Sequence, residues 1–164
     1  MPDIFQLIDQ LSSADTAERS VAAEQLAQLG EDARPAAVSL VRATADDEEV
    51  AEWATAALED MGPPSIDDAK QFAALLQDDN SNINYWSATL IGRLGPAAAH
   101  LTDLLVRSLE SNQNAPVRQR CAWALSKIGP PARSAMASLK RASDGNDPRL
   151  ASLAVKAIEK LGGE

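Results

Sequence analysis

Apolar residues recur along this chain with a period of about 33 residues. A hydrophobic residue followed by glycine recurs at regular intervals, at Leu29-Gly30, Met61-Gly62, Leu94-Gly95, Ile128-Gly129 and Leu161-Gly162. The five glycines stand 32, 33, 34 and 33 residues apart. Self-similarity at a fixed period of this length is typical of helical repeat arrays, in which each repeat is one small supersecondary unit.

Positions counted back from each glycine follow helical spacing. The residues four, eight and twelve before the glycines are apolar or small in nearly every period: Leu26, Leu58, Ile91, Leu125 and Ile158; Ala22, Ala54, Ser87, Cys121 and Ala154; then Val50, Ile83, Val117 and Leu150. Because residues three or four apart share one face of a helix, this pattern predicts one helix per period with a single buried stripe.

Polar residues and glycines mark where these helices begin and end. Side chains able to cap the first free backbone amides stand ahead of each stripe, at Asp15, Asp47, Ser81, Asn114 and Asp147. Glycine favours the left-handed conformation that closes a helix. Prolines follow at Pro63-Pro64, Pro96 and Pro130-Pro131, where a missing N–H is harmless, so we expect the next helix to begin there.

A second set of apolar residues predicts another helix in each period. These residues are Val38, Val41, Phe72, Leu75, Leu76, Leu101, Leu104, Leu105, Met136 and Leu139, and residues 3–12 supply the first helix through Ile4, Phe5, Ile8 and Leu11. The sequence therefore predicts an all-α fold of ten helices in five pairs. The repeats span approximately 1–30, 31–62, 63–95, 96–129 and 130–164 of a single domain, 1–164.

The segment from Asn114 to Gly129 resembles the HEAT-like repeat pattern, with Pro116, Val117-Arg118, Ala124-Leu125 and a final Ile128-Gly129. Asp147-Pro148-Arg149-Leu150 with Leu161-Gly162 is a second match. The first period departs from the pattern at Glu18, as expected for a capping repeat. The resemblance, which extends to the repeats of phycobilin lyases, implies a right-handed α-solenoid and implies no particular reaction.

In HEAT-like proteins the second helix of each pair lines the concave surface. The positions nine, six and two before each glycine share a helix face away from the core stripe, and they hold all three tryptophans. With neighbouring residues they give the predicted partner-binding set: Trp53, Tyr85, Trp86, Arg93, Arg120, Trp123, Lys127 and Lys156. An alternative remains open, in which the tryptophans fill gaps between alanine-rich helices.

Charge is distributed unevenly along the chain. Residues 1–82 contain 4 Lys+Arg and 18 Asp+Glu, a net charge of −14, and residues 83–164 contain 11 and 6, a net charge of +5, in agreement with −9 overall. A groove with this polarity would orient a partner bearing complementary charge, and its basic part favours acidic segments. Solvated acidic loops at helix starts explain part of the acidic excess equally well.

The chemistry-bearing residues give little support for catalysis. His100 is the only histidine and Cys121 the only cysteine, so we expect no catalytic, metal or cofactor site. One cysteine, no signal segment and no long apolar run favour a cytoplasmic protein that does not enter a membrane. The sequence thus predicts a non-catalytic scaffold that binds a protein or peptide on its concave face. Two alternatives remain: weak head-to-tail self-association of a monomer, and nucleic-acid binding through the basic half, which the net charge disfavours.

Overall fold

The computed structural model describes residues 3–162. These residues form two compact units, which meet in the sequence between Asp68 and Ala69. We call residues 3–68 the amino-terminal unit and residues 69–162 the carboxy-terminal unit. A single repeat domain over 1–164 stays a prediction, and its ends lie outside the described residues. Among the described helices, none has the length and apolar content needed to cross a membrane.

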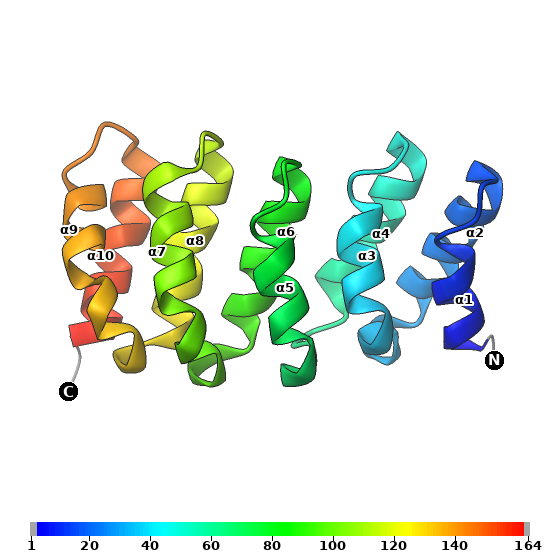
Figure 1. Ribbon diagram of the computed structural model, residues 1–164, viewed down its shortest axis with the longest axis horizontal. Helices are drawn as coiled ribbons and strands as arrows, with labels where there is room; N and C mark the ends of the chain where they lie inside the picture. The colour runs from blue at the N-terminus through cyan, green and yellow to red at the C-terminus, as the bar shows by residue number, and fades with distance from the viewer. Residues whose placement is uncertain (1–2, 163–164) are drawn as a thin grey trace. The chain divides into compact units, whose positions relative to one another are not determined.

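The amino-terminal unit consists of two helix pairs. The first pair is α1 (Ile4–Gln10) and α2 (Thr16–Gln28), and the second is α3 (Ala37–Ala43) and α4 (Glu48–Asp60). Two short 3-10 segments, η1 (Gly30–Ala36) and η2 (Ile66–Asp68), accompany them. The second helices, α2 and α4, pack against each other (Figure 1).

The carboxy-terminal unit holds three more helix pairs: α5 (Ala69–Leu75) with α6 (Ser81–Arg93), α7 (Thr102–Ser111) with α8 (Ala115–Ile128), and α9 (Met136–Ser143) with α10 (Pro148–Gly162). The 3-10 segments η3 (Gly95–Leu101) and η4 (Pro130–Ala135) precede α7 and α9. Within this unit α8 packs against both α6 and α10, so the three second helices form one layer (Figure 1). The described residues contain ten α-helices and no strand, which confirms the predicted all-α fold of helix pairs.

The predicted stripe of the second helices forms the core. Every residue eight before a glycine is fully buried, as are Leu26, Leu58, Ile91 and Leu125 four before it, and Ile158 in the last helix is half-buried. The first helices contribute the residues ten after a glycine, Leu40, Phe72, Leu105 and Leu139, all fully buried. Burying one such side chain stabilises a fold by about 1.5–3 kcal/mol, so this ladder accounts for much of the cohesion of each unit.

Helix capping agrees with the prediction in three of five positions. Backbone N–H groups donate to the carboxylates of Asp15 and Asp147 and to the side-chain oxygen of Asn114. The prediction for Ser81 was wrong by one residue, because the side chain of Asn80 accepts from the N–H groups of Asn82 and Ile83 and fixes the helix start. Asp47 stands at the N-cap of α4 without a side-chain capping bond.

The glycine turns differ from expectation in one respect. Gly30, Gly62, Gly95 and Gly129 have φ between 55° and 74°, the left-handed conformation that glycine adopts at low cost, whereas Gly162 is the last residue of α10. We had expected the prolines after these turns to begin the next α-helices, and they do not. They lie within or beside 3-10 segments, because the chain must turn tightly before the next α-helix can start.

The first helix is buried at Leu11 as expected, whereas Phe5 departs from the expectation. Phe5 is 71% exposed, whereas Leu7 and Leu11 are buried. Residues four apart share a helix face, so Leu7 and Leu11 point to one side and Phe5, two residues before Leu7, points away from it. The expectation that Phe5 contributes to the buried side of this helix was therefore wrong.

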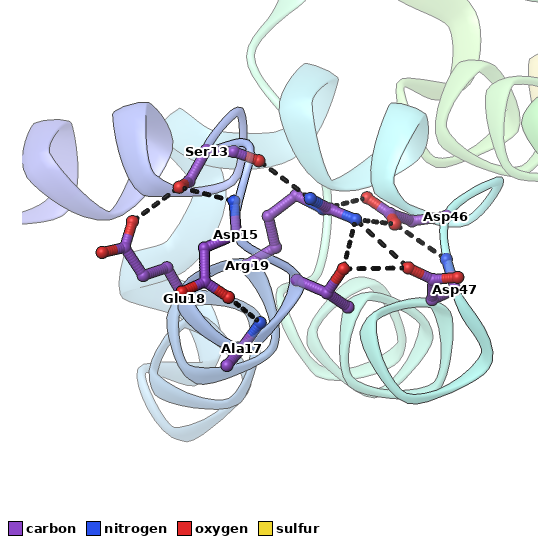
Figure 2. Close-up of polar contacts among 8 residues, drawn as sticks. Ser13, Asp15, Ala17, Glu18, Arg19, Asp46 and Asp47 are labelled. Carbon is purple, nitrogen blue, oxygen red and sulfur yellow. Dashed lines mark hydrogen bonds and ion pairs between the residues drawn. The ribbon is translucent and has the colours of Figure 1, made fainter.

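A polar network ties the two helix pairs of the amino-terminal unit together (Figure 2). The Arg19 guanidinium on α2 donates to both carboxylate oxygens of Asp46 at 2.8 Å and to the carbonyl of Ser13 at 2.8 Å. The hydrogen bond from Arg19 lowers the pKa of Asp46 below its ordinary value of 3.8, although burial acts in the opposite direction. Asp47 accepts from Arg19 and from the hydroxyl of Thr16, which explains why its carboxylate does not cap α4.

Candidate partner-binding surface

The helix face chosen from the sequence lies mostly at the surface of the second helices. Of its residues, those on α2 are Val21, Glu24 and Gln28, those on α4 are Trp53, Ala56 and Asp60, those on α6 are Trp86, Thr89 and Arg93, those on α8 are Arg120, Trp123 and Lys127, and those on α10 are Leu153, Lys156 and Lys160. Only Trp86 and Thr89 are buried, at 8% and 3% exposure. The strip is thus accessible on four of the five helices and partly covered on α6.

Four of the predicted residues form a cluster of aromatic rings and cations on α6 and α8. The guanidinium carbon of Arg120 lies 4.6 Å from the ring centroid of Tyr85 and 4.9 Å from that of Trp123. Arg120 also donates a hydrogen bond to the Tyr85 hydroxyl. The Lys127 ammonium lies 5.5 Å from the Trp123 centroid. Cation–π contacts at exposed sites contribute about 0.5–1 kcal/mol each, so these contacts hold the cluster in one arrangement.

Trp86 occupies a different environment from Trp123. It is buried, its ring meets the Tyr85 ring edge-on with centroids 5.7 Å apart, and the Arg93 guanidinium carbon lies 5.9 Å from its centroid. A buried ring in edge-on contact with Tyr85 fits the alternative in which the tryptophans fill gaps between alanine-rich helices. That Trp86 contacts a partner stays a prediction.

Close approach of two helices fixes the position of Trp123. A Cβ atom added at Gly92 on α6 would lie 2.5 Å from Cζ3 of Trp123 and 3.0 Å from the Cα of Ala124. Only glycine leaves room for the ring and for the α8 backbone at this point, so Trp123 lies across α6. Sequence analysis missed Gly92, although a glycine inside a helical pattern was the available signal.

Two of the predicted residues, Trp53 and Lys156, have no part in these ring and cation contacts. Trp53 is half-buried on α4, in the amino-terminal unit, whereas the other seven belong to the carboxy-terminal unit. Lys156 is exposed on α10. The ring and cation contacts bring together Tyr85, Trp86, Arg93, Arg120, Trp123 and Lys127, and they do not include Lys156.

A pocket opens beside the cluster. Its volume is about 250 Å³, and side chains from α6, α8 and α10 line it: Tyr85, Pro116, Gln119, Arg120, Trp123, Arg149 and Leu153. Gln119 and Arg149 were not among the predicted residues, because neither stands nine, six or two residues before a repeat glycine. The stacking of α8 between α6 and α10 brings them to the same pocket.

The wall of this pocket at the start of α10 is held by hydrogen bonds. Gln119 donates to the carboxylate of Asp147 at 2.9 Å, and Asp147 also accepts from the backbone N–H groups of Arg149 and Leu150 at 3.0 Å. The bond from the Leu150 N–H, followed by that from Gln119, lowers the pKa of Asp147 below its ordinary value of 3.8. Asp147 is therefore a charged, fully engaged capping group.

Residues with reactive side chains take other places. His100 is exposed at the end of η3. Cys121 is fully buried in α8, and burial raises the pKa of its thiol to about 12. Within residues 3–162, histidine, cysteine and carboxylate side chains do not gather in groups of three or more that fit a metal ion.

Comparisons with solved structures identify the same architecture. An engineered protein matches with a TM-score of 0.68 at 20% identity, over 98% of this chain and 80% of its own. The complex of CpcE and CpcF of phycocyanin lyase from Nostoc sp. matches with 0.70 at 18%, over 100% and 66%. A designed armadillo repeat protein in complex with the peptide (KR)4 matches with 0.66 at 19%, over 97% and 82%. At these identities the likeness shows the fold alone.

A comparison with family models is more specific. No curated protein matches the chain. The family model for HEAT repeats matches residues 69–159, which is more than half of the chain and lies within the carboxy-terminal unit. The period, the buried stripe and the helix pairs of that unit agree with this match. The chain belongs to the HEAT repeat family.

Proposed function

We propose that this protein is a non-catalytic binding module that holds an acidic protein segment against the second helices of its carboxy-terminal unit. One observation carries the proposal. Arg120 lies between two aromatic rings at the surface, and no carboxylate among the described residues lies within 4.0 Å of it or of Lys127. Aromatic and arginine side chains presented together are the residue types enriched at binding hot spots.

The charge of the carboxy-terminal unit supports an acidic partner. Residues 69–164 contain 12 Lys+Arg and 8 Asp+Glu, a net charge of +4, whereas residues 1–68 contain 3 and 16, a net charge of −13. The designed armadillo repeat protein of similar fold was solved with a basic peptide. The surface described here carries Arg120, Lys127 and Lys156, so complementarity favours a peptide of the opposite sign.

Self-association is a second candidate, favoured by the opposite charges of the two sequence halves. The acidic unit of one copy would then bind the basic unit of another, a heterologous contact that forms open chains unless the ends are shielded. Nucleic acid is a weaker candidate, because a net charge of −9 opposes phosphate binding. A cytoplasmic location stays part of the proposal.

The test is selection of linear peptides from a random display library on the immobilised protein at low salt. We expect enrichment of peptides rich in Asp and Glu, and we expect the selected peptides to lose at least about tenfold in affinity for Trp123→Ala or Arg120→Met. Lys140→Met, an exposed change on α9 that removes the same charge, is the matched control. Affinity should also fall as salt is raised.

Two results would contradict the proposal. Either no peptide is enriched, or the enriched peptides bind the Trp123→Ala and Lys140→Met variants equally well. Size-exclusion chromatography at low and high salt separates the second candidate, since head-to-tail association would give larger species only at low salt.

A further inference from the structure

The pocket beside the aromatic cluster combines two arginines with an apolar wall. Arg120 enters it from α8 and Arg149 from α10, while Tyr85, Trp123 and Leu153 supply apolar surface. We infer that this pocket holds the carboxylate of one acidic side chain of an extended partner peptide, with Arg120 and Arg149 as its charged contacts. This inference rests on the proposed function and adds to it the chemistry of one subsite.

The size of the pocket fits one side chain. Its volume of about 250 Å³ is below the range of about 300–1,000 Å³ that is common for small-molecule sites, which argues for a single residue and against a cofactor-sized ligand. The lining suits a glutamate in particular. Its methylene groups would contact Trp123 and Leu153, and its carboxylate would reach the guanidinium groups.

Arg120 is arranged in advance for such a contact. Its guanidinium lies over the Tyr85 and Trp123 rings and uses one donor on the Tyr85 hydroxyl. Guanidinium has five N–H donors, so the bond to the Tyr85 hydroxyl leaves donors for a planar carboxylate. Fixing the side chain before binding lowers the entropy lost when the ligand arrives.

Arg149 supplies the second charge from the opposite helix. Its side chain is exposed at the start of α10, and its backbone N–H donates to Asp147. Within the described part of the chain no carboxylate lies within 4.0 Å of its guanidinium. Two arginines without an internal counter-charge at one small pocket favour an anionic guest.

The acidic group nearest the pocket is already engaged. Asp147 accepts from Gln119 and from two backbone N–H groups, and the positive charge of Arg118 further favours its ionised form. Its acceptors face the helix start and Gln119, so Asp147 neutralises neither arginine in the structure. The opposite wall, formed by Tyr85 on α6, brings no carboxylate to the lining.

The experiment uses two fluorescent octapeptides, one of alternating serine and glutamate and one of alternating serine and glutamine. Alternate residues of an extended chain point to the same side, so every glutamate can enter the pocket and the register does not matter. Anisotropy titrations at low salt give the ratio of the two affinities for the wild-type protein and for Arg149→Met. Lys160→Met is the control, since it removes the same charge from an exposed site on α10 outside the pocket.

We expect the wild-type protein to prefer the glutamate peptide by at least about tenfold, and Arg149→Met to lose most of that preference. Lys160→Met should change it by less than about threefold. Arg120→Lys keeps the charge and loses the planar fork, so it should also weaken the preference. Far-ultraviolet circular dichroism confirms that each variant remains helical.

Three outcomes would overturn the inference. They are equal binding of the two peptides by the wild-type protein, an equal loss in Lys160→Met and Arg149→Met, and binding of a single-stranded oligonucleotide that depends on Arg149 in place of the peptide. If library peptides still bind through Trp123 while Arg149→Met has no effect on the glutamate preference, the proposed function stands and this subsite is wrong. If neither the octapeptides nor library peptides bind, both are wrong.

Discussion

The two units of this protein repeat the same pattern of core positions and present different surfaces. In both units the residues eight before and ten after the repeat glycine are fully buried, and in both the second helices pack together. The amino-terminal unit belongs to a sequence half of charge −13, and the carboxy-terminal unit to one of charge +4 that also holds Tyr85, Trp86 and Trp123. The repeat constrains the buried positions and leaves the exposed face free to differ.

The surfaces of the two units differ most clearly in what surrounds an arginine of each. Arg19 in α2 is 16% exposed and is surrounded by acceptors, with Asp46, Asp47 and the Ser13 carbonyl all bonded to it. Arg120 in α8 contacts two aromatic rings and a tyrosine hydroxyl. An arginine whose charge is matched inside the protein contributes to the fold, and one whose charge is unmatched at the surface remains available to a partner.

The largest loss of stability is expected at the core positions that recur in both units. Leu40→Ala in α3 and Leu105→Ala in α7 each remove a fully buried side chain at the position ten after a glycine. Each should lower the free energy of unfolding by about 2–5 kcal/mol, measured by urea denaturation. Cys121, the only thiol and fully buried in α8, reports opening of the carboxy-terminal unit through its rate of reaction with a thiol reagent.

Thiol labelling tests whether the two units open separately. Leu105→Ala should speed labelling of Cys121 more than Leu40→Ala does, because only Leu105 belongs to the same compact unit. Equal acceleration by both variants would mean that the two units open together, and the division at Asp68 and Ala69 would then have no energetic meaning.

Gly92→Ala should produce a smaller loss. A methyl group there would clash with the Trp123 ring and with the α8 backbone, and overpacking typically costs about 1–3 kcal/mol. The better helix propensity of alanine returns about 1 kcal/mol, so a net loss of up to about 2 kcal/mol is expected. At the matching position in the amino-terminal unit, Ala27→Gly should lose about 1 kcal/mol through propensity alone.

A double substitution tests whether the Trp123 ring causes the loss of stability in Gly92→Ala. Combined with Trp123→Ala, Gly92→Ala should cost less than it does alone, because the nearest clashing atoms belong to the ring. An unchanged cost in the double variant would show that the ring does not limit the approach of α6 to α8.

Arg19→Met should lower the urea midpoint of the amino-terminal unit while leaving the labelling of Cys121 unchanged. The substitution keeps an apolar stem and removes the guanidinium donors to Asp46, the Ser13 carbonyl and Asp47. We expect a smaller effect than that of Leu40→Ala. The control is Arg42→Met, an exposed arginine on α3. An equal shift in both variants would show that the loss comes from the change in net charge and not from the hydrogen bonds of Arg19.

Acid should weaken both units by a small amount. The pKa values of Asp46, Glu110 and Asp147 are lowered from ordinary values of 3.8, 4.5 and 3.8, chiefly by hydrogen bonds. A lowered folded-state pKa means that the stabilisation is fully present above the ordinary value and is lost as the pH falls through the folded-state pKa. Unfolding free energies should therefore be flat at neutral pH and decline below about pH 4, with a shallower decline for Asp46→Asn.

The repeat, the helix pairs and the buried stripe follow from the amino-acid sequence alone. Hydrophobic residues at spacings of three and four leave few alternatives to a helix, and glycine with a positive φ marks where it ends. The deviations were local. Ser81 was chosen in place of Asn80 because cap residues stood side by side, and Phe5 was taken as buried because apolarity alone does not give the facing direction.

Which surface residues lie in contact with one another follows from the tertiary structure alone. The sequence placed Trp53, Trp86 and Trp123 on one strip, yet Trp86 is buried with its ring edge-on to Tyr85, and Trp53 belongs to the other unit. Arg149 joins the pocket of Arg120 only because α10 packs against α8. Spacing within a helix fixes which residues share a face, whereas contacts between helices depend on how closely their backbones approach, and that approach is set here by a glycine in the neighbouring helix.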